Sequence, residues 1–276
     1  MNRILVTTDL SANSKAGLRF AINLAAQKKV ELVFLYIHHV LRASTWSDAK
    51  YEYYVSEDRD NIMKELTSLV GGVYKKMNIK PGKHRCEVYH GFGVVDTVAE
   101  YAKQNACDYI CIATRGAGTM QKLFGTNTAK LVKTSEVPVI CVPKSYKAKS
   151  LTKILYASDM ANYEAELAKV VAFAKPLKAA IELLHLSFPY DEMAPKEQAE
   201  KDLKKKLKYD VTVHYQSRDL DHSLMTDLEV AVKKAKPSLV AMFTLQERSF
   251  FDRIFLGSAA EEFTFSSSVP LLVFKK

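Results

Sequence analysis

ILVTTD at residues 4–9 and ILYASD at residues 154–159 are two copies of one pattern, 150 positions apart. In each copy an apolar run ends in two small or polar residues and an aspartate. A helix-like stretch follows each copy, at residues 15–27 and at residues 164–175. This order is typical of a buried strand that leads into a helix. The sequence therefore predicts that the same strand and helix open each half of the chain.

The correspondence continues along both halves. Residues 33–37 (VFLYI) correspond to residues 182–186 (ELLHL), and the closing runs at residues 137–139 (VPV) and 269–271 (VPL) lie 132 positions apart. The offset falls because the second copy is shorter in its middle. A chain of 276 residues is long enough for two domains, each with a core of its own.

We therefore expect a first domain at residues 1–146 and a second at residues 150–276, joined by a polar linker. In the first half the strand-like runs are residues 3–8, 31–38, 84–89, 108–113 and 137–142, and the helix-like stretches are residues 14–28, 57–77, 94–105 and 126–134. Strands that alternate with helices predict an α/β fold of two tandem doubly wound domains with five-stranded open parallel sheets. In such sheets ligands bind beyond the carboxyl ends of the strands.

The composition is that of an ordinary folded protein, with 48% hydrophobic and 26% charged residues, which excludes a disordered or low-complexity chain. No apolar run reaches the roughly 18 residues of a membrane span, and the first ten residues do not resemble a secretion signal, so we expect no membrane association and a cytoplasmic location. The four cysteines all lie in apolar surroundings in the first half: Cys86, Cys107, Cys111 and Cys141. We expect buried thiols rather than a metal site.

The net charge of +9 is concentrated in the first half, where residues 1–148 hold 21 Lys and Arg against 13 Asp and Glu. Such a half can bind an anion, although solvated basic surface explains the excess equally well. The lysine-rich run at residues 196–208 alternates with acidic residues and leucines, which predicts a solvated amphipathic helix. Binding to nucleic acid is therefore not favoured.

Candidate ligand-binding residues lie where the predicted strands of the first half end. The first strand is followed by Thr7, Thr8 and Asp9, the fourth ends at Ala113 before Arg115 and Gly116, and the last helix opens with Gly125, Thr126, Asn127 and Thr128. A glycine turn before a hydroxyl-rich helix start favours an anion, because free N–H groups and the helix dipole both face it. Arg115 can add a charge-assisted contact. A simple helix cap by Thr126 explains the same residues without a ligand.

Several of these residues together resemble the universal stress proteins: Asp9 after the first strand, Gly116 after the fourth, Gly125 and Thr126 before the last helix, and the closing strand at residues 137–142. The resemblance spans the chain as a tandem of two such domains. It implies that Asp9 and Ile37 face an adenine base, and that Gly116, Gly125, Thr126 and Thr128 face phosphates. The signature of the family's nucleotide-binding members is Gly, two residues, a second Gly, nine residues, and a third Gly followed by Ser or Thr. This chain departs from it twice: Ala113 replaces the first glycine, and eight residues instead of nine separate Gly116 from Gly125.

The resemblance implies a regulatory stress-response module that binds ATP or a related adenine nucleotide, with or without Mg²⁺, in its first domain only. The second domain lacks both turn glycines, because Thr244 and Glu247 stand in their places. We expect it to pair with the first domain as an internal pseudo-dimer through residues 137–142 and 269–274. A further dimer of whole chains and an unidentified protein partner stay open.

Two other functions also stay open: a scaffold of the same family that binds no nucleotide, and a slow ATPase. The sequence contains no Walker motif, no complete G-x-G-x-x-G, no G-x-S-x-G elbow and no H-E-x-x-H. We therefore assign no catalytic residue and no metal ligand, and expect hydrolysis to be slow at most.

Overall fold

The computed structural model describes residues 1–114, 126–188, 191–219, 221, 223–244 and 268–275. In the first half, strands and helices alternate: β1 (Arg3–Thr7), α1 (Lys15–Gln27), β2 (Glu31–His38), α2 (Asp48–Met77), β3 (His84–His90), α3 (Val94–Gln104), β4 (Tyr109–Thr114), α4 (Thr126–Thr134) and β5 (Val139–Pro143). The second half continues with β6 (Lys153–Ser158), α5 (Tyr163–Ala174), the short 3₁₀ helix η1 (Lys175–Leu177), β7 (Ala180–Ser187), α6 (Lys196–Leu207), β8 (Val211–Ser217), α7 (Leu224–Ala235), β9 (Leu239–Thr244) and β10 (Leu271–Lys275).

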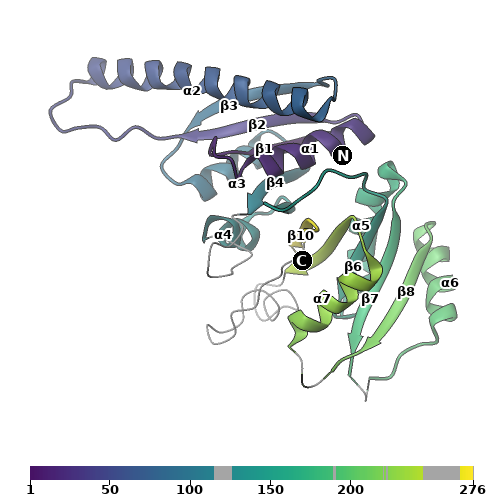
Figure 1. Ribbon diagram of the computed structural model, residues 1–276. Coiled ribbons are helices and arrows are strands. Elements are labelled where there is room, and N and C mark those ends of the chain that lie inside the picture. The colour runs from purple at the N-terminus through teal and green to yellow at the C-terminus, as the bar shows by residue number, and fades with distance from the viewer. Residues whose placement is uncertain (115–125, 189–190, 220, 222, 245–267, 276) are drawn as a thin grey trace.

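The strands form one ten-stranded sheet in the order β3-β2-β1-β4-β5-β10-β9-β6-β7-β8. Each half contributes five parallel strands in the same order, with its first strand flanked by its second and fourth. The chain leaves the first strand toward one side of the sheet and returns on the other, so each half has a switch point beside its first strand. This is the predicted α/β fold of two tandem doubly wound domains (Figure 1).

The apolar core lies in two layers, one on each face of the sheet. Ile4 and Val6 of β1 belong to a cluster with the buried residues of α1, α2, α5 and α6, whereas Leu5 belongs to a cluster with those of α3, α4 and α7. Both clusters contain residues from both halves of the chain. The near-continuous apolar runs of the sequence are explained by this arrangement, because both faces of each central strand are covered.

The two halves meet where β5 and β10 pair antiparallel, with Ile140 opposite Leu272 and Val139 opposite Val273. This confirms the predicted pairing of the two closing strands. The rings of Tyr109 and Phe173 also meet across the halves, with their centroids 5.1 Å apart. The joint is therefore part of the buried core of the protein.

The linker is more closely packed than its polar sequence predicts. Tyr146 is 3% exposed and its ring meets that of Phe20 in α1 edge to face at 5.5 Å. Asn23 Nδ2 donates to the carbonyl of Lys149 at 2.7 Å, and Gln27 Oε1 accepts from the Leu151 N–H at 2.9 Å. These contacts hold the connection between the halves along α1.

Helix α2 begins nine residues earlier than the predicted stretch at residues 57–77. Ser47 caps it by accepting a hydrogen bond from the Lys50 N–H at 3.3 Å, and Asp48 stands in its first turn, where it complements the helix dipole. The buried residues of this helix begin only at Leu66. Its N-terminal part and the connection from β2 extend beyond the strands (Figure 1).

Candidate functional site

A cleft of about 340 Å³ opens at the carboxyl ends of β1, β2 and β4 in the first half. Its lining comprises Thr7, Thr8, Asp9, Ser11, Asn13, Ser14, Leu35, Tyr36, Ile37, Val94, Val98, Ile112, Ala113, Thr126, Asn127 and Thr128. The cleft lies at the switch point beside β1, the position where open α/β sheets bind their ligands.

The loop after β1 is held in place by its own polar side chains. Thr8 Oγ1 lies 2.8 Å from Ser14 Oγ and accepts from the Leu10 N–H at 3.0 Å. Asp9 Oδ1 accepts from the Ser11 N–H at 3.1 Å. Leu10 has a φ of 61°, a left-handed conformation that is uncommon for a leucine and is sustained here by these hydrogen bonds. The loop therefore presents Asp9 at a fixed position at the mouth of the cleft.

Asp9 carries a negative charge at neutral pH. Burial raises the pKa of its carboxyl, but hydrogen bonds from the side chain and backbone of Ser11 outweigh that effect, and the net pKa lies below its ordinary value of 3.8. A carboxylate at this position is a strong acceptor for an N–H group of a ligand.

The walls of the cleft come from β2 and β4. Ile37 and Tyr36 line it from β2, and Ala113 lines it from β4. Helix α1 approaches β4 closely at this point, since a Cβ on Gly17 would lie 3.2 Å from the backbone nitrogen of Ala113. Residue 17 therefore has little room for a side chain while α1 keeps this position.

The third side of the cleft is the start of α4. Thr126 and Asn127 are exposed, whereas Thr128 is 4% exposed. The first N–H groups of a helix have no partner within the helix, so this end of α4 can bind an acceptor on a ligand. The hydroxyls of both threonines lie on residues that line the same cleft.

The structure thus brings together eight of the candidate residues predicted from the sequence: Thr7, Thr8, Asp9, Ile37, Ala113, Thr126, Asn127 and Thr128. Arg115, Gly116 and Gly125 lie outside the described residues. The cleft is also lined by Tyr36 and by the polar residues Ser11, Asn13 and Ser14, which are not among the residues predicted from the sequence. Ser11, Asn13 and Ser14 belong to the largely polar stretch that follows Asp9, and this stretch was the signal that could have indicated them.

The corresponding loop of the second half repeats the backbone geometry exactly where the sequence repeats. Asp159 Oδ1 accepts from the Ala161 N–H at 3.0 Å, Ser158 Oγ accepts from the Met160 N–H at 3.0 Å, and Met160 has a φ of 64°. These hydrogen bonds match those of Asp9 and Thr8. The loop conformation is therefore common to both halves.

The side chains behind this second loop differ. Tyr156 stands where β1 has Val6. Its hydroxyl donates to the carboxylate of the buried Glu166 and lies 2.9 Å from Ser158 Oγ. His185 Nδ1 lies 3.0 Å from the carbonyl oxygen of Ser158. The buried hydroxyl of Tyr156 and the buried carboxylate of Glu166 thus lie beside β6, where Val6 of β1 contributes only an apolar side chain. Thr244 ends β9, and Glu247 lies outside the described residues.

No group of three or more His, Cys, Asp or Glu side chains in the described part of the chain is placed to hold a metal ion. None of the helices described is both long enough and apolar enough to span a membrane.

The two doubly wound halves define the protein as a tandem α/β protein, with a cleft at the switch point of its first half. The family model of the universal stress protein family matches residues 1–143, more than half of the chain. The chain belongs to the universal stress protein family.

Solved structures share this fold over the whole chain. A universal stress protein from Archaeoglobus fulgidus is 21% identical, with a TM-score of 0.73, over 99% of this chain and 98% of that chain. A protein from Pseudomonas aeruginosa described as a putative universal stress protein is 14% identical, with a TM-score of 0.56, over 100% of this chain and 93% of that chain. No curated protein sequence matches the chain significantly.

Another solved structure is a universal stress protein in complex with cAMP. It is 17% identical, with a TM-score of 0.37, and covers 51% of this chain and 96% of that chain. The complex with cAMP is a property of that protein.

Proposed function

We propose that the cleft of the first half binds an adenine nucleotide, ATP in the first place, and that the chain acts as a regulatory module of the stress response. The single observation that carries this proposal is the convergence of Asp9, Ile37 and the hydroxyls at the start of α4 on one cleft. The volume of about 340 Å³ lies within the range of roughly 300–1,000 Å³ that is usual for small-molecule sites.

Each part of the nucleotide has a matching group in this proposal. The carboxylate of Asp9 accepts a hydrogen bond from the exocyclic amino group of adenine, and the backbone of Ile37 borders the base. Thr126 and Thr128 donate hydroxyls to the phosphates, and the first N–H groups of α4 favour the same negative charge. Gly116, Gly125 and Arg115 would complete the phosphate side, with or without Mg²⁺.

Regulation fits this set of residues better than catalysis. Within the described lining of the cleft, Asp9 is the only carboxylate, and the proposal uses it for the base. Phosphoryl transfer to water needs a group that orients the water and usually a metal ligand as well. Hydrolysis is therefore slow at most, and the bound nucleotide acts by changing contacts with a protein partner.

The proposal also covers the organisation of the chain. Residues 1–146 form the nucleotide domain, and residues 150–276 form a copy that binds no nucleotide and pairs with it as an internal pseudo-dimer. The pairing of β5 with β10 and the buried Tyr156–Glu166 hydrogen bond beside β6 support this division of roles. The protein acts in the cytoplasm, and two whole chains can associate further.

The test is thermal stabilisation of the full chain by ATP, ADP and AMP, with Asp9→Ala and Asp159→Ala as a matched pair. In both variants the carboxylate that is removed accepts the N–H of the residue two positions later, in the same loop geometry. A ligand at 100 times its dissociation constant adds about 2.7 kcal/mol to the free energy of unfolding. We expect ATP to stabilise the parent and Asp159→Ala, but not Asp9→Ala.

Two results would contradict the proposal. If no nucleotide stabilises the parent at millimolar concentration, the chain is the scaffold without a nucleotide. If Asp159→Ala loses the effect as completely as Asp9→Ala does, the nucleotide does not bind in the first half alone.

A further inference from the structure

A second and larger cleft, of about 820 Å³, lies at the amino ends of the strands in the first half, opposite the carboxyl ends where the first cleft opens. It is bordered by the starts of β1 and β2, the C-terminal turns of α1 and the segment that follows α2. The residues that line it are Asn2, Arg3, Ile22, Ala25, Ala26, Lys29, Val30, Glu31, Tyr74, Ile79, Lys80, Gly82 and Lys83. None of them lines the cleft proposed for the nucleotide.

The charged residues of this basal cleft carry an excess of positive charge. Its lining contains four cations, Arg3, Lys29, Lys80 and Lys83, and one carboxylate, that of Glu31. Within the described residues neither Lys29 nor Lys80 forms an ion pair, so both charges are available to a ligand.

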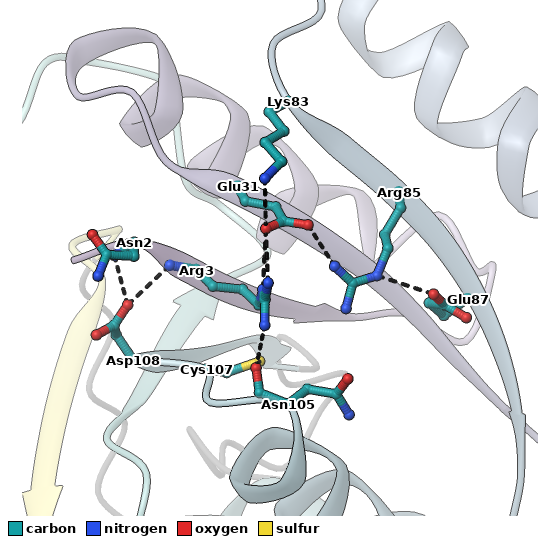
Figure 2. A network of polar contacts seen from close by, with 9 residues as sticks. All are labelled: Asn2, Arg3, Glu31, Lys83, Arg85, Glu87, Asn105, Cys107 and Asp108. Atoms are coloured by element: carbon teal, nitrogen blue, oxygen red, sulfur yellow. Dashed lines mark hydrogen bonds and ion pairs between the residues drawn. The ribbon is translucent and has the colours of Figure 1, made fainter.

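Glu31 is paired with Arg3, Lys83 and Arg85 (Figure 2), so in the described part of the chain it leaves the charges of Lys29 and Lys80 uncompensated by a direct ion pair. Its carboxylate accepts from Arg3 Nη2 at 3.0 Å, lies 3.4 Å from Lys83 Nζ and also pairs with Arg85. Arg3 in turn donates to the carbonyl of Asn105. The carboxylate side chain is 11% exposed, and its role is to hold these cations at the edge of the sheet.

The remaining lining of the basal cleft is apolar. Ile22 and Ala25 face it from α1, Tyr74 from the end of α2, and Ile79 from the segment that follows. Ile79 and Ala25 are only partly buried, so apolar surface of the lining stays open to solvent. A ligand that covers this surface gains hydrophobic free energy in proportion to the apolar area removed from water.

We propose that the basal cleft binds a small amphipathic anion, with an apolar body against Ile79 and Ala25 and a carboxylate or phosphate head beside Lys29 and Lys80. The volume is within the usual range of roughly 300–1,000 Å³ for small-molecule sites. Neither the charged part nor the apolar part of the lining suffices for binding by itself. The lysines are at the exposed rim, where salt weakens ion pairs, and the apolar wall does not select a charge.

The experiment compares three probes on the full chain by isothermal titration calorimetry: dodecanoate below its micelle concentration, 1-dodecanol and inorganic phosphate. We expect saturable binding of one dodecanoate per chain, and affinities at least about tenfold weaker for the other two, because each lacks one half of the required chemistry. Saturating ATP should leave the affinity for dodecanoate unchanged, since the two clefts share no lining residue.

Two pairs of variants locate the site. The double variant Lys29→Glu, Lys80→Glu should weaken dodecanoate binding by about tenfold or more, whereas Lys28→Glu, Lys76→Glu, with the same change in net charge outside the lining, should change it less than about threefold.

The second pair tests occupancy of the cleft without changing its charge. An added Cβ meets no atom within 4 Å at either Gly82, in the lining, or Gly72, outside it. Gly82→Trp should therefore weaken binding and Gly72→Trp should not, with circular dichroism showing that both variants fold.

The proposal is overturned if the parent does not bind dodecanoate saturably, or if 1-dodecanol or phosphate binds as tightly. It is also overturned if both members of the lysine pair lose affinity equally, which would indicate net charge alone. Competition between ATP and dodecanoate would place the lipid-like probe in the other cleft and would equally refute it.

Discussion

Leu272 lies at the joint between the two halves, and its truncation tests whether that joint is as well packed as the structure indicates. The side chain is 0% exposed, and its strand neighbours are Ile140 of β5 and Ala241 of β9. Leu272→Ala removes three carbon atoms, each worth about 0.8 kcal/mol of transfer free energy, and leaves a cavity that neighbouring strands fill only in part. We expect the free energy of unfolding to fall by about 3 kcal/mol.

The assay is urea denaturation followed by far-UV circular dichroism, which reports on all helices and strands. Leu41→Ala is the matched control, because it makes the same chemical change at a side chain that is 79% exposed. The control should change the free energy of unfolding by less than about 0.5 kcal/mol. A loss below about 1 kcal/mol for Leu272→Ala, or equal losses in the two variants, would refute a close-packed joint.

Two further predictions concern titrating groups in the first half. Burial raises the pKa of Glu31, but hydrogen bonds and charges of Arg3 and Lys83 outweigh it and lower the net pKa below 4.5, so the ion pairs stabilise the fold above that pH. Glu31→Gln should therefore be less stable than the parent at pH 7, and urea midpoints of the two should converge as the pH falls below about 4.5; a difference that persists in acid would contradict this. Burial raises the pKa of all four thiols, but Cys86 alone is only half-buried. Iodoacetamide at pH 8 should therefore label Cys86 first and Cys111 only after unfolding, as measured by mass spectrometry of peptides. Early labelling of Cys111 would refute its burial.

The architecture could be predicted from the sequence because the strands of a covered parallel sheet are apolar almost throughout. The predicted runs at residues 31–38 and 126–134 match β2 and α4 to the residue. The start of α2 was missed for a physical reason: no residue before Leu66 is buried in this helix, so the turns that follow Ser47 have no apolar face to give a helical period. The local signals were the cap at Ser47 and Asp48 in the first turn.

The linker shows a different limit. Residues 144–150 contain mostly charged and small residues, and only the packing against Phe20 reveals that Tyr146 belongs to the core. A single aromatic residue in a polar stretch has no periodic pattern from which burial can be predicted.

The two clefts differ in how much of them the sequence indicates. The residues after β1 and at the start of α4 could be predicted to converge, because parallel strands bring their carboxyl ends to one edge. The basal cleft could not, since Arg3, Lys29 and Lys80 belong to three separated segments and no motif joins them. Tyr36 could not be predicted either. Adjacent residues of a strand usually face opposite sides of the sheet, so the choice of Ile37 argues against Tyr36, yet both line the cleft.

The pairing of β5 with β10 has a consequence for how the protein responds to dilution. Pro143 ends β5 and Lys153 begins β6, so a short covalent connection keeps the second half within reach of the first. Such a tether gives the partner strand an effective concentration in the millimolar range, whatever the number of molecules in solution. The joint is therefore expected to persist at concentrations where two separate subunits with the same contacts would dissociate, and a cell can keep this protein at low abundance without losing the pairing.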